Sequence, residues 1–189
     1  MTRTALATLP ARRTTGVALA QARIDTPLGP LTALASDAGL MGLWFDTQQH
    51  SPGLMDAPEE PAQRWLAQTR VELDDYFAGR RRRFGMALAP QGTPFQEAVW
   101  RVLFTIACGD TTSYGRIARE LGNPLASRAV GAAVGRNPIS IIVPCHRVIG
   151  ENGTLTGYAG GLDRKQALLD LEGAALAPGA RHRAQARLL

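Results

Sequence analysis

Cysteine, histidine and lysine are all scarce in this chain of 189 residues. It has two cysteines, three histidines and one lysine, so that 20 of its 21 basic residues are arginine. The cysteines are too few for a disulfide framework, and they lack the spacing of a zinc site. No apolar run is long enough to cross a bilayer, and the longest, residues 139–143, contains Ser140 and stops at Pro144. These absences argue against a secreted disulfide scaffold and against a membrane protein.

The N-terminus lacks acidic residues, with none before Asp25. This bias and the small-x-small ending of "VALAQA" are features of some targeting peptides. However, arginines interrupt the segment, and no continuous apolar stretch of signal length precedes that ending. We therefore expect a short disordered leader and a cytoplasmic protein.

Positive charge is in excess, with a net charge of +5 and a pI near 10.0. Residues 174–189 carry three arginines and no acid, which predicts a basic, disordered tail. Residues 111–136 also hold four arginines against Glu120 alone. This distribution is compatible with a nucleic-acid partner but does not establish one, because arginine enrichment also follows from a GC-rich genome.

The first half has the pattern of a small α/β domain, which we place at residues 1–91. Short apolar segments in residues 22–46 are separated by "PLGP" and "DAG", as in a strand, a turn and two further strands. A helical stripe follows from Pro61, and Gly79 is a suitable stop. The run Arg80–Arg83 is either a phosphate-binding patch or a solvated edge before a linker, and we favour the edge.

A second domain is expected over residues 92–173, and it begins with helix signals. Thr93 is a candidate N-cap and Pro94 suits the first helical position, while Phe95 and Trp100 belong to the expected buried face.

Residues 111–138 then have the outline of a helix-turn-helix. "GNP" at Gly122 ends one short helix and sets the angle of the next. We expect Leu125, Ala129 and Val130 on the inner side of the second helix, whose other positions are small except for Arg128. Such a face either packs closely on another helix or lets the backbone approach a ligand.

The stretch "IIVPCHRVIG" places Cys145 directly before His146. A free thiol is mostly protonated at neutral pH, so a nucleophilic cysteine needs a base or a positive environment. Neighbouring side chains in an extended chain point to opposite sides, which favours a proton relay through water over direct contact, with a third group to orient the imidazole. The competing interpretations are a buried structural cysteine and a cysteine hydrolase.

The order of these motifs raises the case for a reactive cysteine. "VGAAVGRNPISIIVPCHRVIG" followed by "GTLTGYAGGLDRKQALLDLEG" resembles the O6-alkylguanine-DNA alkyltransferases, also called methylated-DNA-protein-cysteine methyltransferases. The likeness runs from about Thr93 to Gly173, whereas the first 91 residues are similar only in arrangement. It implies an α/β N-terminal domain, with a small antiparallel sheet and a helix, and a mainly α C-terminal domain with a helix-turn-helix.

The resemblance also implies a reaction. Cys145 would take the alkyl group from guanine O6 and keep it as a thioether, so that each molecule acts once, without a cofactor. His146 would be the base acting through water, and Glu172 the carboxylate that orients it. Asn137 would hold the active-site turn, and Tyr114 would help to rotate the nucleotide out and protonate the guanine. Val148, Tyr158 and Ala159 would line the guanine pocket.

The implied partner is double-stranded DNA containing O6-alkylguanine, bound by a monomer. The helix-turn-helix would enter the minor groove, where Arg128 fills the stack left by the flipped base, because chemistry on a stacked base requires extrusion. The small residues that permit close approach are Ala126, Ser127, Ala129 and Gly131. The resemblance leaves open whether O4-methylthymine is also repaired and whether molecules cooperate along DNA.

Two positions depart from the family pattern, Ala107 where proline is common and Val134 where bacterial members often have a polar residue. Relatives with a metal in the first domain need several cysteines and histidines there, and this chain has only His50, so we predict no metal site. The rival hypotheses are a lesion-binding or regulatory protein, which would not need the thiol, and a hydrolase, which would turn over repeatedly.

Overall fold

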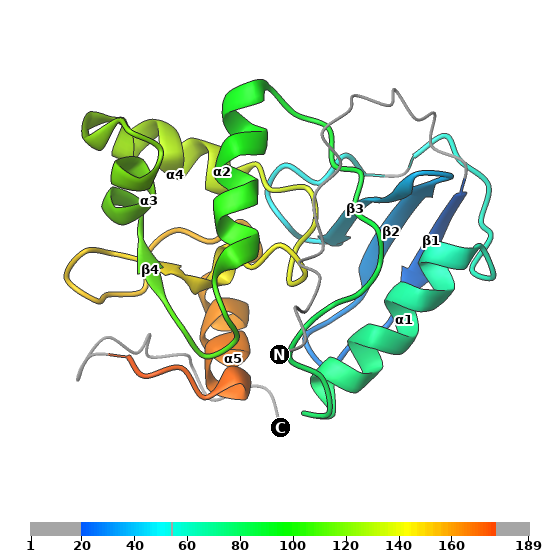
Figure 1. Cartoon of the computed structure of the whole chain (residues 1–189). Helices are drawn as coiled ribbons and strands as arrows, with labels where there is room; N and C mark the ends of the chain where they lie inside the picture. The colour runs from blue at the N-terminus through cyan, green and yellow to red at the C-terminus, as the bar shows by residue number, and fades with distance from the viewer. Residues whose placement is uncertain (1–19, 54, 177–189) are drawn as a thin grey trace, which may run out of the picture.

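The computed structural model describes residues 20–53 and 55–176, which form two parts with different secondary structure. The expected leader lies outside this range, as does the tail beyond residue 176. Figure 1 shows the sheet and its covering helix at one side of the molecule and a group of helices at the other side. This arrangement confirms the expected combination of a small α/β part and a mainly helical part.

The N-terminal part is an antiparallel sheet in the order β1 (Ala20–Ile24), β2 (Leu31–Ser36) and β3 (Gly39–Phe45). Helix α1 (Arg64–Phe77) lies across one face of this sheet (Figure 1). The Gln63 side chain caps its first turn by accepting from two backbone N–H groups, and Gly79 follows its end with a positive φ of 72°. The residues that α1 buries recur at helical spacing and are Leu66, Thr69, Glu72, Leu73 and Tyr76.

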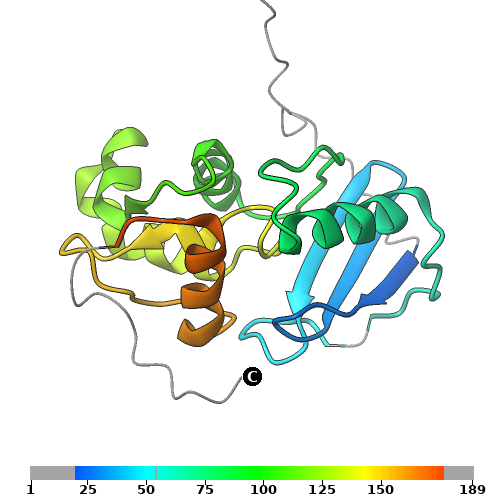
Figure 2. The same cartoon turned by 90° about the horizontal axis from the view of Figure 1, so that it is seen from below.

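The C-terminal part begins with α2 (Pro94–Thr105), where Thr93 and Gln96 form a reciprocal capping box. It continues through β4 (Thr112–Ser113), α3 (Tyr114–Glu120), the 3-10 turn η1 (Pro124–Ala126) and α4 (Ser127–Gly135). The chain then forms the 3-10 turn η2 (Cys145–Arg147), β5 (Val148–Ile149) and α5 (Leu162–Glu172). Figure 2 shows α5 beside the η2 and β5 region, on the side of the helical part that faces the sheet.

The sheet continues into the segment that precedes Cys145. The Leu43 N–H donates to the Pro138 carbonyl at 2.8 Å, and the Ser140 N–H donates to the Leu43 carbonyl at 2.9 Å. The Ser140 hydroxyl also donates to the buried Gln48 side chain at 2.7 Å. The edge of β3 therefore fixes the active-site segment from the N-terminal side.

Three details of the sequence-based expectation are wrong. Cys145 and His146 lie in the 3-10 turn η2 and not in an extended chain, because the preceding residues 139–143 form a compact turn against Leu43 of β3, with Ile141 at a φ of 71°. Leu125 and Ala129 are exposed, with Leu125 95% accessible, because α4 turns Val130, Ala133 and Val134 inward. Phe95 is 39% exposed, since it lies in the first turn of α2 ahead of the buried Val99 and Trp100.

Candidate active site

Cys145 is the first residue of η2 and is only 4% exposed. The Asn137 amide donates to Cys145 Sγ at 3.0 Å and to the Val143 carbonyl at 2.8 Å, while its oxygen accepts from the Ile139 N–H at 3.0 Å. This amide thereby closes the turn between α4 and η2 and points a donor at the sulfur. Burial raises the pKa of the Cys145 thiol, although the Asn137 hydrogen bond and the charge of Lys165 oppose this shift. The resting group is a thiol that needs a base.

His146 and Glu172 form a buried pair beside this cysteine. His146 Nε2 lies 3.0 Å from Glu172 Oε1, and neither side chain is exposed. Burial raises the Glu172 pKa, but hydrogen bonds from His146 and Arg147 outweigh it and hold that pKa well below its usual range. For His146, burial lowers the pKa, and the hydrogen bond and charge of Glu172 oppose this shift. The neutral imidazole thus keeps its proton on Nε2, facing the anion, and presents a lone pair at Nδ1.

The Nδ1 atom of His146 is buried and has no hydrogen-bond partner among the described residues. Within that part of the chain, no hydrogen bond joins the His146 imidazole directly to the Cys145 sulfur. A buried acceptor of this kind is suited to a bridging water.

Glu172 is the last residue of α5, and Gly173 ends the helix in the left-handed conformation with a φ of 71°. Its carboxylate accepts from Arg147 Nε at 2.9 Å and Nη2 at 2.7 Å, and from the Tyr76 hydroxyl at 2.8 Å. Arg147 is itself buried and also donates to the Ile106 carbonyl. Sequence reasoning predicted Glu172 but missed Arg147 and Tyr76.

The single lysine of the chain, Lys165, is completely buried. Its ammonium donates to the carbonyls of Val148, Thr156 and Gly157 at 2.5, 2.6 and 3.3 Å. Burial lowers the pKa of Lys165 to about 8, and the nearby Cys145 opposes that shift. Sequence reasoning missed Lys165, although one lysine among 20 arginines was a usable signal. The pKa of a lysine, unlike that of an arginine, shifts readily on burial, so a lone lysine is a candidate for a buried site.

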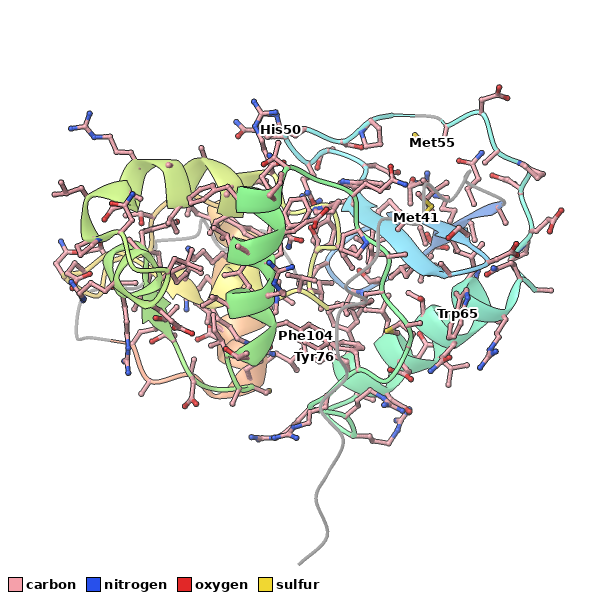
Figure 3. The ribbon with its side chains drawn as sticks, turned by 45° about the horizontal axis from the view of Figure 1, so that its top comes forward. Met41, His50, Met55, Trp65, Tyr76 and Phe104 are labelled. Carbon is pink, nitrogen blue, oxygen red and sulfur yellow. The ribbon has the colours of Figure 1, made fainter. Side chains whose placement is uncertain are left out.

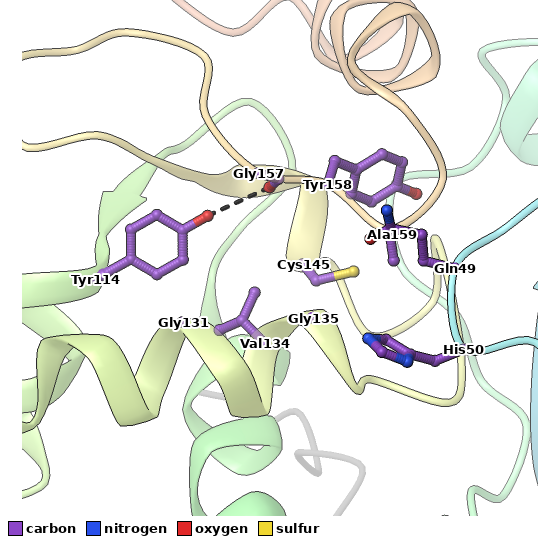
Figure 4. A pocket seen from close by; sticks show the side chains of 10 residues that line it. All are labelled: Gln49, His50, Tyr114, Gly131, Val134, Gly135, Cys145, Gly157, Tyr158 and Ala159. Atoms are coloured by element: carbon purple, nitrogen blue, oxygen red, sulfur yellow. Dashed lines mark hydrogen bonds between the residues drawn. The ribbon is translucent and has the colours of Figure 1, made fainter.

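An open pocket of about 120 Å³ lies over Cys145 (Figure 4). The Tyr114 hydroxyl reaches it and donates to the carbonyls of Gly157 and Thr156 at 3.2 and 3.3 Å. The hydroxyl of Tyr158 is buried without a partner among the described residues. The residues that line the pocket are Gln49, His50, Tyr114, Gly131, Val134, Gly135, Cys145, Gly157, Tyr158 and Ala159.

The pocket brings together five of the expected site residues, Tyr114, Gly131, Cys145, Tyr158 and Ala159, and adds two from the N-terminal part. Gln49 donates its N–H to the Ala159 carbonyl at 3.0 Å, and His50 faces the pocket with a positive φ of 63°. Close contact between the parts requires Gly160, because a Cβ there would lie 2.6 Å from the Tyr158 ring and 3.2 Å from the ring of Phe45. Val148 is not one of the lining residues; it is buried, and its carbonyl is held by Lys165.

The second helix of the helix-turn-helix presents a small-residue face. Arg128, Ala129 and Ala132 are exposed, while Ala126, Ser127 and Gly131 are half-buried. The Trp100 indole anchors the helix on α2 by donating to the Ala133 carbonyl at 2.9 Å. The departure at Val134 is accommodated in the core, where its side chain also reaches the pocket.

The described residues contain no group of three or more metal-ligating side chains, and none of their helices is long and apolar enough to span a membrane.

Comparison with known proteins decides the family. Residues 94–174 match the 6-O-methylguanine DNA methyltransferase DNA-binding domain, and residues 19–90 match the ribonuclease-like domain of the same proteins. A methylated-DNA–protein-cysteine methyltransferase from Methanosarcina acetivorans is 48% identical over 149 residues, which are 79% of this chain and 95% of the relative. This chain belongs to the methylated-DNA–protein-cysteine methyltransferase family.

Further relatives agree. The Mycolicibacterium paratuberculosis methyltransferase is 50% identical over 79% of this chain and 89% of its own length. A crystal structure of Mycobacterium tuberculosis OGT in complex with DNA has a TM-score of 0.76 at 45% identity, covering 82% of this chain and 93% of that one. The match over residues 19–90 extends the family likeness to the segment before Thr93, for which sequence reasoning had found only a similar arrangement.

Proposed function

We propose that this methyltransferase repairs O6-alkylguanine in double-stranded DNA by moving the alkyl group to Cys145. The observation that carries the proposal is a buried cysteine at the base of an open pocket, next to a His146–Glu172 pair. The relatives whose printed names give the same reaction support it.

In the proposed reaction, the Cys145 thiol passes its proton through a water to His146 Nδ1. The sulfur then forms a bond to the alkyl carbon as the bond from that carbon to guanine O6 breaks, and the electron pair stays with the guanine. Glu172 stabilises the imidazolium, because its carboxylate is anionic and within hydrogen-bonding distance of Nε2. Asn137 and Lys165 supply the donor and the positive charge that favour the thiolate.

The departing guanine takes up one proton while the thiol proton rests on His146. Solvent then reprotonates the donor and accepts the proton from His146, so the step balances and needs no cofactor. We assign the donation to Tyr114, whose hydroxyl lies at the edge of the pocket and whose pKa is raised, chiefly by burial. Tyr158 and the Ala159 backbone would hold the guanine, and Val148 would act from behind the pocket through its contact with Lys165. The thioether at Cys145 is stable, so each molecule acts once.

We assign DNA binding to the exposed side of α4. The small residues Ala126, Ser127, Ala129 and Gly131 allow the backbone to approach the minor groove, and Arg128 would replace the flipped base in the stack.

We also propose that the chain works as a monomer. We further propose that it works in the cytoplasm, a reducing compartment in which the two cysteines of the described range would stay free. The proposed division into two domains at residue 91 is supported by the two family matches, of which one ends at residue 90 and the other begins at residue 94.

The test is the intact mass of the protein before and after exposure to an equimolar duplex with one O6-methylguanine. We expect a gain of one methyl group, located on Cys145, and no gain with the undamaged duplex. Cys145→Ala is the control and should remain unmodified. Tight binding without a mass gain would instead indicate a lesion sensor, and repeated turnover would indicate a hydrolase.

A further inference from the structure

The Glu172 carboxylate receives a hydrogen bond from outside its own part of the molecule. The Tyr76 hydroxyl donates to Glu172 Oε1 at 2.8 Å, across 96 residues of sequence. The same oxygen accepts from His146 and from Arg147 Nη2. Among the described residues that donate to this carboxylate, Tyr76 is the one supplied by the N-terminal part.

The phenol is held firmly in place. Tyr76 is 2% exposed and lies in the last turn of α1, where the two parts of the molecule meet (Figure 3). Its ring packs edge-on against Phe77 at 5.3 Å and tilted against Phe84 at 5.4 Å between centroids. Burial and the adjacent Glu172 raise the pKa of Tyr76 far above its usual range, so that the hydroxyl remains a donor.

The geometry of the carboxylate makes this donor chemically relevant. Glu172 ends its helix, so its orientation depends on the groups that bind its two oxygens. Arg147 binds both oxygens, whereas Tyr76 adds its hydrogen bond to the oxygen that also faces His146. A donor at that oxygen limits both the rotation of the carboxylate and the share of its charge that His146 receives.

We propose that Tyr76 is a positioning residue for alkyl transfer, and that the relay runs from Cys145 through His146 and Glu172 to Tyr76. The inference rests on the proposed function. It gives the N-terminal part a role in the chemistry, because helix α1 holds the outer end of the relay. A purely structural Tyr76 would instead join the two parts without affecting the base.

The two roles predict different pH behaviour. Without the phenol, Glu172 interacts more strongly with the imidazole, which raises the pKa of His146. The protonated base is inactive, so the acidic limb of the rate profile moves to higher pH, by about half a unit. The other charged or titratable groups around this pair are Arg147, Lys165, Cys145, Tyr158, Cys108 and, beyond Cys108, Arg82, and none of them is altered by the substitution.

The experiment measures single-turnover methyl transfer against pH in the full chain, with Tyr76→Phe compared with Thr69→Val. Thr69 is buried on the same helix and donates to the Trp65 carbonyl, so its variant removes a hydroxyl away from Glu172. We expect Tyr76→Phe to lower the maximal rate about tenfold and to shift the acidic limb. Thr69→Val should change neither. Phenylalanine fills the same space and Arg147 keeps both carboxylate oxygens paired, so the fold should persist, which a thermal melt checks.

A double-mutant cycle with Glu172→Gln completes the test. If Tyr76 acts through Glu172, its effect on the rate disappears when the carboxylate is absent. An equal effect in both backgrounds, or a Tyr76→Phe rate within twofold of wild type with an unmoved pH profile, would overturn the inference. The wild-type protein separates the two proposals, because failure of wild-type transfer refutes the proposed function, whereas normal transfer with an inert Tyr76→Phe refutes only this role.

Discussion

Replacing Glu172 by glutamine should destabilise the fold strongly as well as slow alkyl transfer. The carboxylate is completely buried and accepts four hydrogen bonds, two from Arg147 and one each from His146 and Tyr76. Glutamine offers one acceptor oxygen and places an NH₂ group against donors. It also leaves the buried guanidinium of Arg147 without a counterion.

The magnitude follows from that unpaired charge. Removing one partner of a buried ion pair costs about 3–5 kcal/mol. This is a large part of the roughly 5–15 kcal/mol by which domains are stable. At about 2–4 °C per kcal/mol for a chain of this size, Glu172→Gln should melt roughly 10 °C lower at pH 7. Glu120→Gln is the matched control, because it makes the same change at an exposed position of α3 and should stay within about 0.5 kcal/mol of wild type.

The pH dependence gives a second signature. The Glu172 pKa is lower in the folded state than its ordinary 4.5, so its stabilisation is present above pH 4.5 and is lost as pH falls below that value. The pKa of His146 is also lowered, from 6.5, so wild-type stability begins to fall below pH 6.5 as the unfolded state takes up a proton. Glu172→Gln should keep the fall in stability below pH 6.5, which comes from His146, and should lose the further fall below pH 4.5.

Urea unfolding between pH 7 and pH 3 measures both effects. Adding Arg147→Met to Glu172→Gln should restore part of the lost stability, because it removes the orphaned charge. Three results would refute the argument from the buried pair. They are a loss of unfolding free energy below about 1 kcal/mol for Glu172→Gln, the same pH dependence of that free energy below pH 4.5 as in wild type, and no recovery in the double variant.

Three further predictions concern the pocket and the DNA-binding face. Lys165→Met should raise the pKa of the Cys145 thiol and slow single-turnover transfer at pH 7 about tenfold, with partial recovery at higher pH; an unchanged rate profile would contradict this. Arg128→Ala should slow transfer from duplex DNA more than tenfold but leave the reaction with free O6-benzylguanine unchanged, and equal effects on both would place Arg128 in the chemistry instead. His50→Ala should open the pocket mouth and raise the benzyl-to-methyl rate ratio on DNA about threefold, measured by competition; a constant ratio would show that His50 does not restrict the alkyl group.

Local sequence signals predicted the elements well. The turn residues between the apolar segments marked the three strands, and Thr93 and Pro94 marked the start of α2. These signals are local because capping and turn formation depend on residues within one turn of each other. Leu125 shows the limit, since an apolar residue at a helix start can face either way, and only the seating of α4 on Trp100 leaves it exposed.

The sequence alone determined that a cysteine nucleophile next to a histidine would need a relay and an orienting third group, because thiol chemistry demands a base whatever the fold. Motif resemblance then pointed to Glu172. Only the tertiary structure decided what surrounds that relay. Tyr76, His50 and Lys165 lie 69, 95 and 20 residues from Cys145, and packing brings them beside the site. Their roles depend on burial and on contacts across the two parts, which no local pattern encodes.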